Sequence, residues 1–133
     1  MTAHALGSFE IKSWNEDQYS ELPEGGKLTR ASVTQEFTGD IEGAGDVEWL
    51  MCYRADGTAN IVGLQHFDGR IGDRTGGCVL QMTGTFDGSE ARGNWFVVAG
   101  SGSGELSGIR GDGGMVAPLG QPAAAITLDY DFE

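Results

Sequence analysis

Short runs rich in Val, Ile, Thr, Trp, Phe and Tyr follow one another along this chain, separated by glycine-containing turns roughly every ten residues. No run shows the 3.6-residue apolar period of an amphipathic helix. The pattern therefore predicts an all-β, antiparallel sandwich or barrel with helix as a minor element at most. Two segments are predicted to lie outside strands: Asn15 to Glu24, which is polar and contains Leu22-Pro23, and Pro118 to Pro122.

Turn signals at Asp56-Gly57, Gly72-Asp73 and Asp87-Gly88 set the expected register of three hairpins. A two-residue loop fixes which residues lie opposite one another, and strand alternation then assigns each side chain to a face. The first hairpin pairs Glu48 with Gln65, Leu50 with Gly63 and Cys52 with Ile61. The second pairs Phe67 with Cys78, Gln65 with Leu80 and Gly63 with Met82. The third pairs Cys78 with Val97, Leu80 with Trp95 and Met82 with Gly93.

All three registers agree on one shared face, which we interpret as a barrel interior because inward glycines relieve crowding between coiled strands. Its members are Leu50, Cys52, Ile61, Gly63, Phe67, Cys78, Leu80, Met82, Gly93, Trp95 and Val97, with Glu48 and Gln65 as polar members. The opposite face carries Val47, Trp49, Met51, Tyr53, Val62, Leu64, Val79, Phe96 and Val98. This outer face is too apolar to be fully wet, so we expect cover by a terminal segment or self-association, with a homodimer as the first expectation.

One segment, VVAGSGSGELSGIRG at residues 97–111, resembles the Gly-Thr-Gly turn and Ala-Arg-Gly strand of the allene oxide cyclase and dirigent barrels, with Ser103 in place of the usual Thr. From about Gly7 to its end, the chain is similar to a bacterial family of uncharacterised proteins assigned to that barrel superfamily. The segments that carry this similarity are GSFEIKSW, KLTRASV, FTGDIEGAGDVEWLM, DGTANIVGLQ, GRIGDRTGGCVLQMTGTF, VVAGSGSGELSGIRG and ITLDYDF.

The resemblance implies an up-and-down antiparallel β-barrel of about eight strands, allene oxide cyclase-like, whose interior holds one small ligand or is filled by side chains. It implies no activity. No catalytic residue of the cyclases has a counterpart that can be placed in this sequence, so none is carried over.

A chain of 133 residues is expected to form a single domain, with residues 1–6 flexible. Its net charge of −12 repels phosphate backbones and anionic lipid headgroups, which argues against nucleic-acid and membrane partners. The first residues lack the basic start and apolar run of a signal peptide, and we expect a cytoplasmic protein. Cys52 and Cys78 lie on strands separated by a third, which argues against a disulfide.

The opposed pair of Glu48 and Gln65 is the main candidate for chemistry. Inside an apolar cavity, desolvation would raise the pKa of Glu48 and suit it to general acid or base work, with Gln65 orienting it. Such a pair also arises for purely structural reasons or at a wet barrel mouth. Cys52, Leu80, Met82 and Trp95 are the expected ligand-binding residues around it.

Two other features are expected to bind nothing. The glycine run Gly100 to Gly104 is no phosphate cradle, because Glu105 to Arg110 is predicted to be strand rather than helix. His66 is predicted on the outer face and His4 in a terminus, so neither a metal site nor a cofactor is expected.

Three functions remain open. The first is a small-molecule-binding barrel that holds an apolar ligand in its interior. The second is a cofactor-free cyclase or isomerase in which Glu48 handles a proton. The third is a structural or interaction protein whose barrel is filled by side chains and whose apolar outer face carries its role.

Overall fold

Consecutive strands pair around the molecule until the last strand returns to the first. In the computed structural model, which describes residues 2–133, the pairing order is β1-β2-β3-β4-β5-β6-β8-β9, and β9 pairs with β1. The strands are β1 (Ala3–Glu21), β2 (Lys27–Gly39), β3 (Ile41–Tyr53), β4 (Ala59–Ile71), β5 (Arg74–Phe86), β6 (Glu90–Val97), β7 (Ser103–Gly104), β8 (Ile109–Pro118) and β9 (Ala123–Phe132). The predicted all-β antiparallel barrel is confirmed, with short β7 added beside β5.

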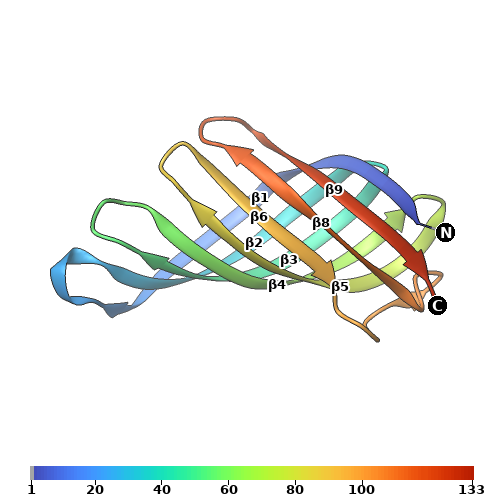
Figure 1. Ribbon diagram of the computed structural model, residues 1–133, viewed down its shortest axis with the longest axis horizontal. Helices are drawn as coiled ribbons and strands as arrows, with labels where there is room; N and C mark the ends of the chain where they lie inside the picture. Colours follow the sequence, from blue (N-terminus) through green and yellow to red (C-terminus); the bar gives the residue numbers. More distant parts are fainter. Residues whose placement is uncertain (1) are drawn as a thin grey trace.

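The barrel is elongated, and its two ends are built differently (Figure 1). At one end, which we call the mouth, four hairpin tips are staggered along the oblique barrel wall. At the other, the closed end, lie the start of β1, the end of β9 and the loop between β6 and β8. Within residues 2–133 no helix is long and apolar enough to cross a membrane.

Strand β1 is the longest and extends beyond the barrel wall at the mouth. It pairs with β2 as far as Glu21, but with β9 only as far as Glu10. The expectation of a non-strand segment at Asn15 to Glu24 is therefore wrong up to Glu21. The segment is polar because a two-stranded ribbon outside the barrel has much of its surface in water. Ala3 to Leu6, expected to be flexible, are paired with β9.

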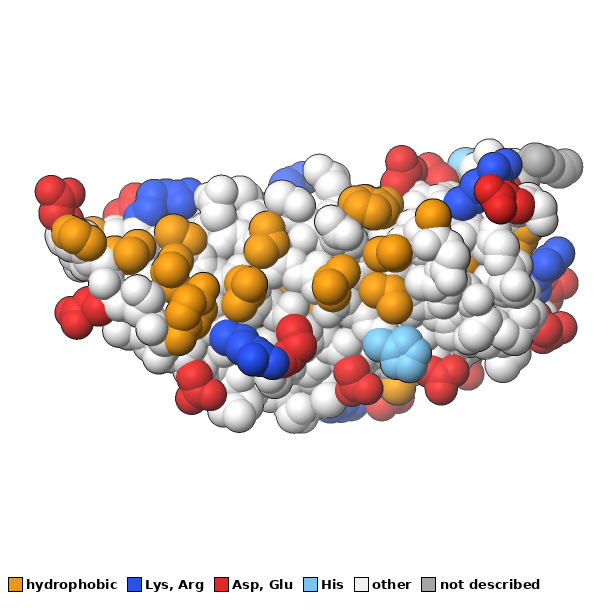
Figure 2. Space-filling view, turned by 90° about the horizontal axis from the view of Figure 1, so that it is seen from below, with side chains coloured by type: hydrophobic (Ala, Val, Ile, Leu, Met, Phe, Trp, Pro, Cys, Tyr) orange, Lys and Arg blue, Asp and Glu red, His pale blue; other side chains and the backbone are white. Residues whose placement is uncertain are grey.

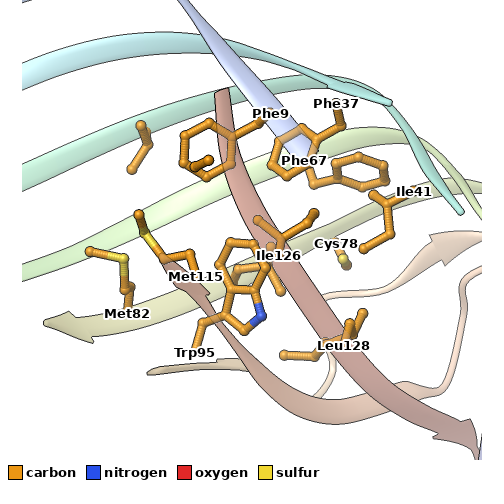
Figure 3. Close-up of a cluster of buried hydrophobic side chains, with 14 of the residues drawn as sticks. Phe9, Phe37, Ile41, Phe67, Cys78, Met82, Trp95, Met115, Ile126 and Leu128 are labelled. Atoms are coloured by element: carbon orange, nitrogen blue, oxygen red, sulfur yellow. The ribbon is translucent and has the colours of Figure 1, made fainter. Parts of the chain in front are cut away.

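Inward side chains fill the barrel from its middle to the closed end. Phe37 packs edge-on against Phe67 at a ring distance of 5.3 Å, and its ring lies 5.5 Å from Phe9 and 6.5 Å from Trp95. Figure 3 shows these four rings together, with Cys78 and Leu128 further along the same core. This part of the interior is a packed core.

The loop of residues 98–108, which we call the closing loop, seals the closed end. Leu106 is fully buried, and its backbone N–H donates to the Ser103 carbonyl oxygen at 3.0 Å. Glu105 ties the loop to β5, because its backbone and carboxylate both bond to Thr75. The prediction of strand from Glu105 to Arg110 is wrong before Ile109, where β8 begins. Turns there aim the Leu106 side chain into the barrel.

The three predicted registers have different outcomes. The second hairpin is confirmed, with Phe67 opposite Cys78. In the third, Leu80 lies opposite Val97, two residues from the predicted partner, because the Asp87 carboxylate accepts bonds from the backbone N–H groups of Ser89 and Glu90 and holds a longer loop. A two-residue shift leaves every side chain on its predicted face.

The first hairpin is shifted by one residue from the prediction, and this shift exchanges the inward and outward side chains of β3. Tyr53 pairs with Ala59, and the Asp56 carboxylate organises the intervening loop by accepting bonds from the Thr58 N–H and hydroxyl groups. Because alternation has a period of two, this shift exchanges the two faces of the strand. Glu48, Leu50 and Cys52, predicted inward, point outward, whereas Val47, Trp49 and Met51 are buried in the interior.

We expect thiol labelling of the two cysteines to show which face of β3 points outward. Cys52 is half-buried on the outer side of β3, while Cys78 is 1% exposed and burial raises the pKa of its thiol to about 11. Because the thiolate is the reactive form, a thiol reagent at pH 8 should label one group per native chain and two in denaturant. In Cys52→Ala the native labelling should disappear. Absence of a rapidly reacting thiol in the native protein would contradict the outward orientation of Cys52 on β3, and two such thiols would contradict the burial of Cys78.

Candidate functional site: an apolar pocket at the mouth

A pocket of about 210 Å³ opens at the mouth of the barrel. Its walls are almost entirely apolar, and Arg92 is the one charged residue among them. The lining residues are Phe9, Ile11, Trp14, Trp49, Met51, Tyr53, Ala59, Ile61, Met82, Phe86, Ala91, Arg92, Met115 and Ala117.

Two tryptophans form one wall of the pocket. Trp14 on β1 and Trp49 on β3 face the interior across β2, with ring centroids 5.5 Å apart. Gly63 on β4 makes room for the Trp49 indole, since a Cβ there would lie 2.4 Å from Trp49 Cδ1. The prediction that inward glycines relieve crowding is confirmed at Gly63, although the side chain it accommodates differs from the predicted one.

The rim of the pocket carries a small polar group centred on Glu16. Its carboxylate accepts hydrogen bonds from Trp14 Nε1 at 3.0 Å and from the buried Thr29 hydroxyl at 2.7 Å. Burial, followed by the nearby Glu16 charge, raises the pKa of Tyr53 to about 12, so this phenol stays protonated at neutral pH. On the other side of the rim, Arg92 is paired with Glu90.

Glu48 is absent from the pocket and the interior. Its exposed carboxylate lies on the outer face, where Arg30 Nη2 is 2.5 Å from Glu48 Oε1. A hydrogen bond from Ser32, followed by one from Arg30, lowers the pKa of Glu48. The predicted inward position and raised pKa are therefore wrong. Gln65 is only 5% exposed and points inward, so the two residues lie on opposite faces of the wall.

The four predicted ligand-binding residues are divided among three places. Met82 lines the mouth pocket. Leu80 and Trp95 border a smaller interior cavity of about 10 Å³, beside Gln65, and Met82 lines this cavity as well. Cys52 lines neither, because its side chain lies on the outer face of β3. Trp49, Met51 and Tyr53 were not predicted as lining residues, although they form the more apolar face of β3, and burial preference could have identified them.

Metal ligands do not gather at this site. Among residues 2–133 no three His, Cys, Asp or Glu side chains are close enough to hold a metal ion together. His4 Nδ1 instead lies 2.5 Å from Asp129 Oδ1 across the β1–β9 pair.

The fold and the pocket define a small closed β-barrel protein, in the size class whose interior is filled by side chains or holds one small ligand. The family model for the protein of unknown function DUF3224 matches residues 5–130, so the chain belongs to the DUF3224 family. The expected relation to a bacterial family of unknown function is thereby confirmed. The closed eight-stranded barrel is loosely consistent with the allene oxide cyclase fold.

One similar solved structure covers the whole chain. It is a protein with unknown function from the DUF3224 family of Shewanella oneidensis MR-1, 26% identical in sequence, with a TM-score of 0.84. The match spans 100% of this chain and 99% of that one. No curated protein matches this chain significantly.

Proposed function

We propose that this protein binds a small apolar molecule in the mouth pocket. The observation that carries the proposal is a 210 Å³ opening lined by aromatic and thioether side chains at the end of a packed barrel. Leaving that much apolar surface in contact with water is unfavourable, and a ligand would remove it from water. Scaled from an apolar cavity of about 150 Å³ that holds benzene, the volume suits roughly eight to ten non-hydrogen atoms.

Filling the pocket tests this proposal. Ala117 on β8 and its partner Ala91 on β6 both line the mouth, so Ala117→Phe would place a ring in the opening. We expect calorimetry to detect ethylbenzene binding to the wild-type protein at one site per chain, with affinity reduced about tenfold or more in the variant.

The matched control is Ala125→Phe, which adds the same ring to the exposed outer face of neighbouring β9. It should bind ethylbenzene as the wild-type protein does. Absence of binding to the wild type, or equal affinities for the two variants, would contradict the proposed function.

The alternative of a cofactor-free cyclase or isomerase has less support. It relied on Glu48 and Gln65 meeting in one cavity, and these side chains lie on opposite faces of the barrel wall. The Glu16 carboxylate lies at the rim of the mouth, and hydrogen bonds from Trp14 and Thr29 already engage it.

We further propose that the protein forms a homodimer in the cytoplasm through its outer face. Leu50, Val62, Leu64 and Phe96 are 45–53% exposed and lie on adjacent strands β3 to β6. Figure 2 shows hydrophobic side chains spread over one face of the molecule. Among the described residues, β1 and β9 are paired in the barrel wall and do not cover this face, and we propose a second copy of the chain as its cover.

Native mass spectrometry should therefore detect a dimer. Leu64→Glu is expected to convert it to monomer because the change buries a charge in the interface. Leu119→Glu, in the exposed β8–β9 turn, should remain dimeric. A monomeric wild-type protein would exclude this use of the outer face.

A further inference from the structure

A cluster of unpartnered polar atoms lies directly below the mouth pocket. Gln35 is 2% exposed, Gln65 5% and Trp49 7%. Both polar atoms of the Gln35 amide, Gln65 Oε1 and Trp49 Nε1 are buried without a hydrogen-bond partner anywhere in residues 2–133. Buried polar groups in folded proteins are nearly always hydrogen-bonded, so several unpaired ones at a single place require an explanation.

All three residues line the same interior cavity of about 10 Å³. Gln35 on β2 lies opposite Gly45 on β3, and Gln65 reaches the same glycine from β4. A Cβ on Gly45 would lie 2.8 Å from Gln65 Oε1, so the absence of a side chain at Gly45 leaves room for the Gln65 amide. The cluster therefore offers donors from Gln35 and Trp49 and acceptors from Gln35 and Gln65 to one small volume.

The inner cavity adjoins the mouth pocket. Phe9, Trp49, Met82 and Met115 line both, so they form the floor of one and the roof of the other. Figure 3 shows Met82 and Met115 at the same end of the buried cluster as Trp95. Gly93 on β6 lies opposite Met115 on β8, and a Cβ there would be 3.2 Å from Met82 Cγ and Sδ. Unbranched methionine side chains can move aside more easily than other core side chains.

We propose that the cluster recognises the head group of the ligand, which is a neutral hydroxyl or carboxamide attached to an apolar body in the mouth pocket. This inference rests on the proposed function. A hydroxyl or carboxamide both donates and accepts, matching the mixed set offered by Gln35, Gln65 and Trp49. A carboxylate is disfavoured, because no cation lines the inner cavity and a buried unpaired charge is costly.

Three matched compounds test the head group in the wild-type protein. Ethylbenzene has no head, 2-phenylethanol has a neutral donor and acceptor, and phenylacetate has an anion. We expect calorimetry to show 2-phenylethanol binding about tenfold tighter than phenylacetate and several-fold tighter than ethylbenzene. Ethylbenzene binding as tight as that of 2-phenylethanol, or preferred binding of phenylacetate, would overturn the head-group assignment and leave the apolar pocket in place. Failure of all three to bind would contradict the proposed function itself.

Variants of the cluster provide the second measurement. Gln35→Leu and Gln65→Leu should each weaken 2-phenylethanol binding about tenfold and leave ethylbenzene binding within twofold of wild type. Gln81→Leu, on the exposed face of β5, should change neither affinity. Gln35→Leu should also raise the melting temperature of the unliganded protein, because it replaces an unpartnered buried amide with an apolar side chain. Equal loss of both ligands in the two cluster variants would mean a purely structural role and overturn the inference.

Discussion

Phe37→Ala is expected to lower the free energy of unfolding by about 3–5 kcal/mol, which is at the upper end of what a single core truncation costs. Phe37 is 1% exposed and lies at the centre of the aromatic core, within 6.5 Å of the rings of Phe9, Phe67 and Trp95. Its truncation removes buried apolar area and aromatic contacts from three strands at once. Gly45 on β3, where a Cβ would lie 2.9 Å from Phe37 Cε1, has no side chain that could fill the cavity.

Urea unfolding of the two proteins measures this difference. Tyr19→Ala is the control, because Tyr19 is an aromatic residue 58% exposed on β1, outside the proposed dimer face, and its truncation should cost less than about 1 kcal/mol. A loss below about 1 kcal/mol in Phe37→Ala would mean that the barrel is filled in another way.

Leu106→Ala is expected to cost about 2–5 kcal/mol, although the residue lies in a glycine-rich loop where substitutions are usually tolerated. Leu106 is the fully buried side chain through which the closing loop seals the barrel end. Its loss leaves a cavity against the core and weakens the packing that holds the loop on β5, where Ser103 and Gly104 pair with Gly77 and Gly76.

Leu119→Ala provides the same truncation at a leucine that is 68% exposed, and it should change stability by no more than about 0.5 kcal/mol. Hydrogen exchange gives an independent measurement. In Leu106→Ala the amide of Val79, which donates to the Ser101 hydroxyl, should lose protection, because that bond depends on the loop staying in place. Equal stability of the two leucine variants would show that the loop does not seal the barrel.

The residues of the candidate site could be predicted only in part from the sequence. Met82, Leu80, Trp95 and Gln65 were placed in the interior because their strands belong to a hairpin whose loop was identified correctly, or to one whose error was an even number of residues. Cys52 and Glu48 were misplaced by a single residue in the loop after β3.

An Asp-Gly pair suggested a two-residue loop there, but the Asp56 carboxylate supports a longer one through its bonds to Thr58. Hydrogen bonding by a turn side chain is a weak sequence signal. Its effect is large, because a register shift of one residue moves every side chain of the strand to the opposite face. Because Trp49 and Met51 were predicted to point outward, the mouth pocket that they line was not predicted.

The sequence by itself determined an antiparallel all-β fold and the inward residues of β4, β5 and β6, because turn residues and two-residue alternation are local signals, and its family resemblance added the closed barrel. Only the tertiary structure decided the orientation of β3, the insertion of Leu106 and the open mouth. Each of these depends on contacts between segments far apart in the chain, such as Trp14 with Trp49 and Leu106 with the barrel core. Burial of large apolar side chains selected the face of β3 that the loop sequence left ambiguous.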